Sequence, residues 1–258
     1  MILLGILAAS GAGAAGGVAG YAAGGDTPSK VAIVDKFAFS DDTRTTLGTG
    51  LSIARDDMAG MSNSGVAGYA AGGRAATRVA TVDKFLFSND SRSTLGTGIS
   101  NETNLLAGMS NSGVAGYVAG GDDLDYVATV DKFAFPSDSK STLGTGLSNA
   151  RAGVAGMSNS GVAGYVAGGR DALYVDTVDK FAFPSDSRTT LGTGLSGDRA
   201  YLAGMSNSGT AGYVGGGLVP SYVATVDKFA FPSDSRTTLG TGLSSARRRP
   251  AGFQNEAV

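Results

Sequence analysis

Apolar residues along the chain fall in short runs, and each run ends at a cluster of Gly, Ser, Asn, Asp or Pro. Such runs predict β-strands separated by tight turns, whereas no segment has the 3.6-residue spacing of an amphipathic helix. Between residues 150 and 196 the pattern predicts four strands, over 150–157, 162–167, 174–183 and 189–196. The glycine-rich sequences are poor helix formers, which supports an all-β chain.

The same four-strand pattern occurs five times without insertion or deletion. The tripeptide Asp-Lys-Phe and the Tyr of the second run each recur every 48 residues, at Asp35, Asp83, Asp131, Asp179 and Asp227 and at Tyr21, Tyr69, Tyr117, Tyr165 and Tyr213. A period of this length is typical of propeller blades or of helical HEAT-type arrays, and the strand pattern favours the propeller. The sequence therefore predicts an all-β, five-bladed β-propeller with four antiparallel strands per 48-residue blade.

The third strand of each repeat indicates how a blade is buried. In the fourth repeat, Phe181 and Phe183 lie on one face of this strand, while Val178 and Ala182 lie on the other. A sheet with apolar residues on both faces is expected between two neighbouring blades. Ten of the 11 Phe residues belong to this Phe-x-Phe pair, so we expect a core in which the same few positions are used five times.

The amino-acid composition excludes several kinds of ligand and catalytic site. The net charge is −2 and only 16% of the residues are charged, which gives no reason to expect nucleic acid as a partner. The chain has no Cys, His or Trp. It therefore lacks a thiol nucleophile, a Ser-His-Asp triad and the usual zinc ligands. We expect no cofactor and no metal, and a protein that is not an enzyme.

Two segments of each repeat resemble the kelch motif. Residues 117–121 (Tyr-Val-Ala-Gly-Gly) look like the Tyr-x-x-Gly-Gly end of a kelch strand, and 130–133 (Val-Asp-Lys-Phe) is similar to the kelch Val-Glu-x-Tyr segment. The sequence departs from that pattern at Leu143 and its equivalents, which replace the usual Trp, and no Asp follows the aromatic residue. The resemblance implies a kelch-like propeller. The place near the blade junction where kelch repeats often carry Pro-Arg is occupied by Arg55, Arg151, Arg199 and Arg247.

Longer stretches of the repeat resemble proteins of tailed phages. The runs Val-Asp-Lys-Phe-Ala-Phe-Pro-Ser-Asp-Ser and Ala-Gly-Met-Ser-Asn-Ser-Gly are similar to repeats in proteins of cyanophages and other tailed phages. This resemblance implies a virion protein of the tail, fibre or decoration type, with other virion proteins as partners and host-surface carbohydrate as a ligand. It implies a location in the virion, with an extracellular location as the alternative.

The two ends of the chain continue the repeat beyond five copies. We expect one propeller domain over 1–258, with repeats over about 13–252 and spare first-strand segments at 1–12 and 251–258. One segment can complete the ring and the other can pair with a second subunit, so a homo-oligomer is an open alternative. The apolar stretch 1–9 is shorter than the ~20 residues of a membrane span, so none is expected. A strand and a cleaved signal are its two interpretations.

Two windows of each repeat differ between the copies, whereas the rest is nearly constant. In a four-stranded meander the two corresponding connections lie at the same end of the blade, so the variation is expected on one face of the ring. Drifting solvent loops are one interpretation and a binding surface is the other. The first window comprises 26–30, 74–78, 122–126, 170–174 and 218–222, and the second comprises 53–58, 101–106, 149–154, 197–202 and 245–250.

The candidate binding residues are charged and aromatic members of these windows. Tyr and Arg are favoured at the centres of binding interfaces, and Tyr also stacks on sugars. The candidates are Arg74, Arg78, Asp122, Asp123, Asp125, Tyr126, Arg170, Tyr174, Tyr201 and Tyr222.

The opposite face is expected to carry a constant ring of acidic turn residues. One carboxylate per turn falls short of the six to eight oxygens that calcium takes, so turn capping is the favoured role. Asp35 and Lys36, with their copies, are expected to satisfy each other at the blade edge. The turn residues are Asp42, Asp90, Asp138, Asp186 and Asp234.

Two functions are compatible with these observations. The first is a non-enzymatic structural and adhesion protein of a phage particle, which docks to other virion proteins and binds host-surface glycan through the variable face. The alternative is a secreted propeller that binds or cleaves polysaccharide, in which paired carboxylates such as Asp122 and Asp123 act on the glycan. Close repetition of the same residues counts against an enzyme, because a catalytic site needs several residue types in one place.

Overall fold

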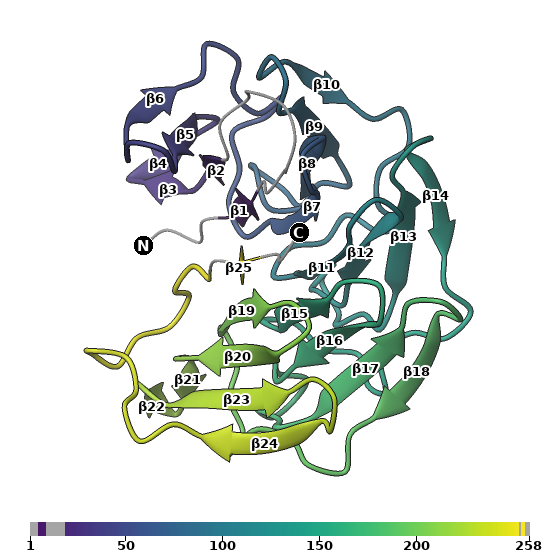
Figure 1. Ribbon diagram of the computed structural model, residues 1–258, viewed down its shortest axis with the longest axis vertical. Coiled ribbons are helices and arrows are strands. Elements are labelled where there is room, and N and C mark those ends of the chain that lie inside the picture. Colours follow the sequence, from purple (N-terminus) through teal and green to yellow (C-terminus); the bar gives the residue numbers. More distant parts are fainter. Residues whose placement is uncertain (1–4, 9–18, 253, 256–258) are drawn as a thin grey trace.

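The computed structural model describes residues 5–8, 19–252 and 254–255. These residues form five blades of four antiparallel strands each, arranged as a β-propeller, and none of them lies in a helix (Figure 1). The prediction of a five-bladed, all-β propeller is thus confirmed. No helix within this part of the chain is long and apolar enough to cross a membrane.

Each blade is a meander whose strands follow the chain from the centre of the ring to its rim (Figure 1). The first strands are β1 (Gly5–Ala8), β7 (Ala59–Asn63), β11 (Ala107–Asn111), β15 (Ala155–Asn159) and β19 (Ala203–Asn207). The second strands are β2 (Ala19–Ala23), β8 (Ala67–Ala71), β12 (Ala115–Ala119), β16 (Ala163–Ala167) and β20 (Ala211–Gly215). The third strands are β5 (Val34–Ala38), β9 (Val82–Leu86), β13 (Val130–Ala134), β17 (Val178–Ala182) and β23 (Val226–Ala230). The fourth strands are β6 (Arg44–Thr46), β10 (Arg92–Thr94), β14 (Ser139–Thr142), β18 (Ser187–Thr190) and β24 (Ser235–Thr238).

The fourth strand lies earlier in each repeat than the sequence pattern predicts. In blade 4, β18 covers Ser187–Thr190 instead of 189–196. Asp186 has a φ of 54°, which makes the turn tight enough for Ser187 to pair with Ala182 at once. The Gly-rich residues that follow β18 are no longer part of the strand. They still lie beside the segment that precedes β17, where the Leu195 amide donates to the Asp176 carbonyl at 2.7 Å.

Neighbouring blades are joined by a stacked aromatic pair and a charged clasp. Tyr165 in β16 stacks on Phe231 of blade 5 with ring centroids 5.2 Å apart. Its hydroxyl donates to Asp234 at 2.8 Å, and Lys180 Nζ donates to the same carboxylate at 2.6 Å. The same three contacts join each earlier pair of blades, through Tyr21, Tyr69 and Tyr117.

This clasp corrects two expectations from the sequence. All five turn residues have positive φ, but the carboxylates of Asp90, Asp138, Asp186 and Asp234 bind the preceding blade instead of only capping their own turn. Lys180 likewise pairs with the next blade, not with the adjacent Asp179. Alternate side chains of a strand point to opposite faces, so neighbouring Asp and Lys cannot meet.

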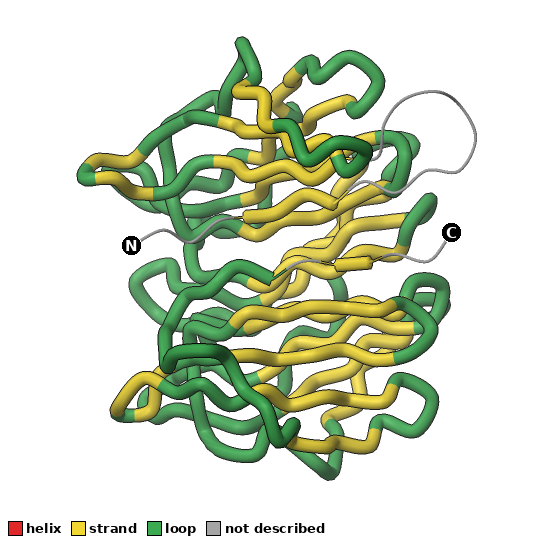
Figure 2. The backbone as a smooth tube through the Cα atoms, turned by 60° about the vertical axis from the view of Figure 1, so that its left-hand side comes forward, coloured by secondary structure: helices red, strands yellow, loops and turns green. Residues whose placement is uncertain are grey.

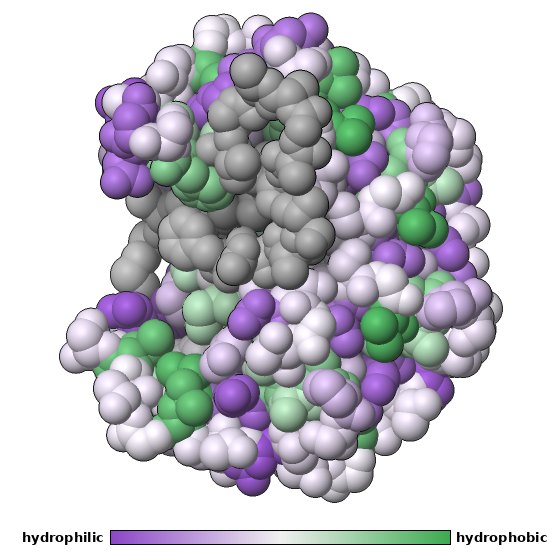
Figure 3. All heavy atoms as spheres, in the orientation of Figure 1, coloured by the Kyte–Doolittle hydropathy of each residue, from purple (hydrophilic) through white to green (hydrophobic). Residues whose placement is uncertain are grey.

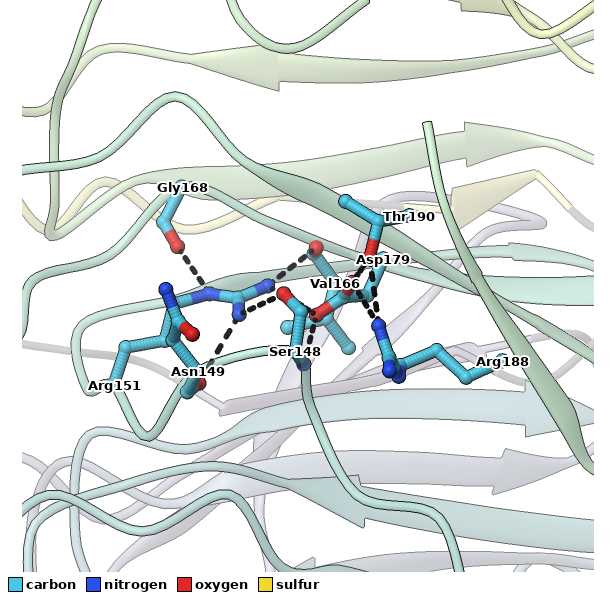
Figure 4. A network of polar contacts seen from close by, with 8 residues as sticks. All are labelled: Ser148, Asn149, Arg151, Val166, Gly168, Asp179, Arg188 and Thr190. Atoms are coloured by element: carbon cyan, nitrogen blue, oxygen red, sulfur yellow. Dashed lines mark hydrogen bonds and ion pairs between the residues drawn. The ribbon is translucent and has the colours of Figure 1, made fainter. Parts of the chain in front are cut away.

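A buried ion pair also lies at the junction between blades 3 and 4 (Figure 4). Arg151, from the link between blades 3 and 4, contacts Asp179 of β17 at 2.9 Å, and both side chains are at most 1% exposed. The Ser148 amide and hydroxyl and the Thr190 hydroxyl also donate to Asp179. Burial raises the pKa of Asp179, but the hydrogen bonds from Thr190 and Ser148 and the charge of Arg151 outweigh it and hold that pKa below its usual range.

The first strands meet through glycine at the centre of the ring. A Cβ atom on Gly108 would overlap the carbonyl oxygen of Gly60, and one on Gly156 would overlap that of Gly108. The amide of Ser110 donates to Ser158 Oγ of the next blade at 2.9 Å. Only glycine allows this approach, so the position is constant between repeats.

The two ends of the chain occupy different places. β1 completes blade 1 by pairing Gly5 with Ala23, whereas the repeat register would pair Gly11 with Ala23. Residues 5–8 (Gly-Ile-Leu-Ala) are better strand formers than the Gly and Ala of 11–15, which accounts for the shift. β25 (Gln254–Asn255) runs parallel to β19 in blade 5. The rest of the spare segments 1–12 and 251–258, together with residues 13–18 of the first repeat, lies outside the described residues.

Candidate functional site: the loop face

The second variable window of one repeat lies beside the first variable window of the next repeat, and together the windows form what we call the loop face. The amide of Asp56 donates to the Arg74 carbonyl at 3.1 Å, and the Arg74 amide returns a bond of 2.9 Å to the Asp56 carbonyl. Turning the molecule shows its loops gathered at two ends of the sheets (Figure 2). Equivalent backbone pairs in the later blades join Asn104 to Asp122, Ala152 to Arg170 and Ala200 to Leu218.

A backbone ring lies at the centre of the loop face. Each of its last four members donates its amide to the carbonyl of the equivalent residue one blade earlier, at 2.7 to 3.0 Å. All five have φ between 54° and 67°, a conformation that is strained for side chains such as Leu and Tyr. The Nη1 atom of the last member approaches Oδ1 of the first at 3.4 Å, so an ion pair closes the ring. The members are Asp57, Leu105, Gly153, Tyr201 and Arg249.

Blades 1 to 3 supply an acidic sector in which most carboxylates are engaged. Asp57 is buried, and burial raises its pKa although the charge of Arg249 opposes the rise. Arg78 contacts Asp122 at 2.7 Å. Asn101 donates to Asp123 at 2.8 Å. These carboxylates are therefore held in the loops by basic and amide side chains.

Blades 3 to 5 supply a sector of tyrosine and arginine. Arg170 lies over the rings of Tyr126 and Tyr174, at 5.9 and 5.8 Å from their centroids. Burial lowers the pKa of Arg170, but a hydrogen bond with Tyr201 and the neighbouring tyrosines raise it more, so the guanidinium stays charged. Cation–π contacts of this kind hold flat aromatic and guanidinium surfaces together.

The arginine pair near the C-terminus extends this sector. Arg248 lies over Tyr201 and Tyr222, at 6.0 and 5.6 Å. Arg249 lies 5.1 Å from the centroid of Tyr201, which joins the sector to the central ring. The side chain of Tyr222 is half exposed, so its ring remains accessible.

The structure thus separates the candidate residues into groups. Tyr126, Tyr174 and Tyr201 surround Arg170, and Tyr222 lies next to them through Arg248. Arg74 pairs with Asp56, at 3.3 Å. Arg78, Asp122 and Asp123 belong to the acidic sector, and Asp125 stands at an exposed loop tip.

Two kinds of residue on this face were missing from the candidate set. Arg248 and Arg249 lie within a variable window, but the sequence does not show that they reach Tyr201. Leu124 and Leu173 stand at loop tips and are 85% and 75% exposed. A large apolar residue inside a loop of polar turn formers is the signal that identifies them.

The loop face offers a surface, not an enclosed pocket, at its tyrosine-rich centre. A cavity of about 20 Å³ is lined there by Leu105, Gly153, Val154, Tyr201 and Arg249, among others. That volume is close to what one water molecule needs, so a larger ligand would bind across the outside. Within the described part of the chain, no group of three or more acidic side chains is placed to hold a metal ion.

Sheet topology, repeat and blade contacts together define this chain as a five-bladed β-propeller repeat protein. It matches no protein-family model and no curated protein. The resemblances to kelch repeats and to phage proteins therefore rest on the residues quoted for them.

Proposed function

We propose that the protein is a non-enzymatic adhesion module that binds surface carbohydrate through the tyrosine- and arginine-rich sector of its loop face. One observation carries this proposal: Tyr126, Tyr174, Tyr201 and Tyr222 gather around Arg170 and Arg248. Tyrosine rings stack on the apolar faces of sugars, and charged guanidinium groups donate to their hydroxyls. A surface of this kind can bind a polysaccharide chain that lies across it.

The resemblances extend the proposal to the setting of the protein. Kelch-like blades and phage-like repeats favour a virion protein of the tail, fibre or decoration type, which docks to other virion proteins. A rigid propeller with exchangeable loops suits attachment, because the loops can change without disturbing the blades.

Binding of the purified protein to an array of bacterial surface polysaccharides tests the carbohydrate part, followed by titration of each polysaccharide that binds. Tyr222→Ala should weaken binding about tenfold, because aromatic hot-spot side chains contribute more than 1 kcal/mol. Arg44→Ala is the control, since this 57% exposed side chain pairs with Asp35 on blade 1 outside the loop face. Equal weakening in both variants, or no binding at all, contradicts the proposal. Cleavage of a bound polysaccharide would favour the enzymatic alternative.

Antibody labelling of purified phage particles in the electron microscope tests the setting. Label on tails, fibres or heads supports a virion protein and distinguishes its three placements. Particles without any label contradict it and leave the extracellular alternative.

A further inference from the structure

Blade 1 has an apolar face that no other blade covers. Phe37 and Phe39 are 40% and 52% exposed. Their equivalents in the other blades pack under the preceding blade, and Phe85 and Phe133, for example, are fully buried. Figure 1 shows a wider sector between blade 5 and blade 1 than between consecutive blades, and the outline of the molecule is indented there in Figure 3. We call this region the open sector.

The same face of blade 1 presents an unused carboxylate. Asp42 has the left-handed turn conformation of its four equivalents, with a φ of 57°. Each equivalent accepts a tyrosine hydroxyl and a lysine ammonium group from the preceding blade. Asp42 has no such donors among the described residues.

Blade 5 presents the matching donors on the other side of the open sector. Tyr213 and Lys228 are the equivalents of Tyr165 and Lys180, which clasp Asp234. Neither has an acceptor in the described part of the molecule. The guanidinium group of Arg247 donates only to Ser245 there, at 3.2 Å, whereas that of its equivalent Arg199 donates to the buried Asp227 at 2.8 Å.

The open sector already holds the beginning of another blade. β25 lies beside β19 and pairs Gln254 with Ser206, a separation of one repeat. A Cβ atom on Gly252 would overlap the carbonyl oxygen of Gly204, which is the contact made between the first strands of neighbouring blades. The position next to blade 5 is therefore that of the innermost strand of a sixth blade.

We propose that the open sector is a docking site for the second to fourth strands of one further blade of the same 48-residue type, presented by a partner protein, with β25 as the innermost strand of that blade. The partner's blade would supply an Asp for Arg247, a turn Asp for Tyr213 and Lys228, and a Tyr and Lys for Asp42. These contacts repeat the four junctions within the chain, with complementary charge on both sides. A whole second copy does not fit, because its blade 4 would fall on the place of blade 5. The inference is independent of what the loop face binds.

Calorimetric titration of the full-length protein with a peptide copied from residues 211–250, which spans the second to fourth strands of a blade, tests the proposal. One peptide should bind per chain, and Asp42→Asn should weaken binding about tenfold, as expected for loss of a charged hydrogen bond. Asn retains the left-handed turn conformation, so the variant removes charge without straining the backbone. Asp41→Asn is the matched control, since Asp41 bonds only to Thr43 of its own turn.

A second variant keeps the test decisive if the peptide fails to bind. In this variant a further copy of residues 203–250 follows Pro250 in the same chain. Increased resistance to chemical denaturation in this variant, without peptide binding, would show that only a covalently attached blade fits and would overturn a partner's role. Self-association of the unmodified protein that Asp42→Asn abolishes would assign the sector to a second copy. Absence of all three effects would show that the sector is not a docking site.

Discussion

Two junctions between blades solve the same packing problem with different residues. Between blades 3 and 4, Arg151 is buried and paired with Asp179 at 2.9 Å. Between blades 2 and 3 the equivalent of Arg151 is Thr103, which is also buried, and the equivalent carboxylate is Asp131. A cavity of about 10 Å³ remains there, lined by Thr103 and Asp131 among others. The smaller side chain leaves the space that the guanidinium group fills elsewhere.

What persists at both junctions shows which contacts are essential. Asp131 accepts bonds from the Ser100 amide and hydroxyl and from Thr142, each at 2.6 Å, as Asp179 does from Ser148 and Thr190. Lys140 is the nearest cation, at 3.8 Å from Asp131. Hydroxyl and amide donors therefore suffice to dock a blade, and the buried arginine adds stability to a junction that already forms.

The largest effect is expected when the junction between blades 3 and 4 is given the threonine of the junction between blades 2 and 3. Arg151→Thr removes the buried cation beside Asp179, and breaking a buried ion pair costs about 3–5 kcal/mol. We expect a loss of that size in the free energy of unfolding, measured by chemical denaturation with circular dichroism. Arg188→Ala is the control, because Arg188 contacts the same carboxylate from a partly exposed position at 3.4 Å. It should cost less than ~1 kcal/mol, and equal losses would refute the distinction.

The reverse substitution should produce a smaller gain. Thr103→Arg places a guanidinium group in the cavity beside Asp131, where a hydrogen bond to a charged group contributes about 1.5–3 kcal/mol before the side-chain entropy of arginine is subtracted. We expect the free energy of unfolding to rise by about 1 kcal/mol, measured by chemical denaturation. Thr103→Lys should raise the free energy of unfolding less, because an ammonium group lacks the planar set of donors with which a guanidinium group binds a carboxylate. A destabilised Thr103→Arg protein would show that the junction has relaxed around threonine.

The smallest effect is expected in how the stability of the unmodified protein and of the Arg151→Thr variant depends on pH. Because the pKa of Asp179 is held below its usual range, its contribution to stability is complete above about pH 4, the usual Asp value, and is lost as the pH falls through the lowered pKa. Arg151→Thr removes part of the cause, so the variant should lose less stability than the unmodified protein between about pH 5 and 2. Denaturation curves across this range measure the difference, and parallel losses would contradict it.

The repeat made the fold predictable, because each periodic residue has one structural place. Tyr165 and Phe181 are fully buried, as expected for core positions that recur every 48 residues. The strand limits were less predictable. The Leu-Gly-Thr-Gly-Leu segment after β18 resembles a strand, yet glycine and the early turn at Asp186 release it from the ladder.

The contacts of the variable residues could not be predicted in the same way. A period identifies which residues are equivalent, but it does not show that Arg248 meets Tyr201 of the preceding repeat as well as Tyr222 of its own. The partnership depends on how far neighbouring loops reach across the centre of the face. The clasp was hidden for a similar reason, because Tyr165 and Lys180 lie 69 and 54 residues before Asp234, in another repeat.

The glycine contacts at the centre also bear on why the copies have stayed alike. Each of Gly60, Gly108, Gly156 and Gly204 accepts the backbone of the next repeat only because that repeat also has glycine there. A substitution at this position in one repeat therefore disturbs the packing of the neighbouring repeat, which makes the substitution destabilising. Interchangeable parts of this kind can be duplicated or deleted as whole units, while each unit alone has little freedom to diverge along its inner strand.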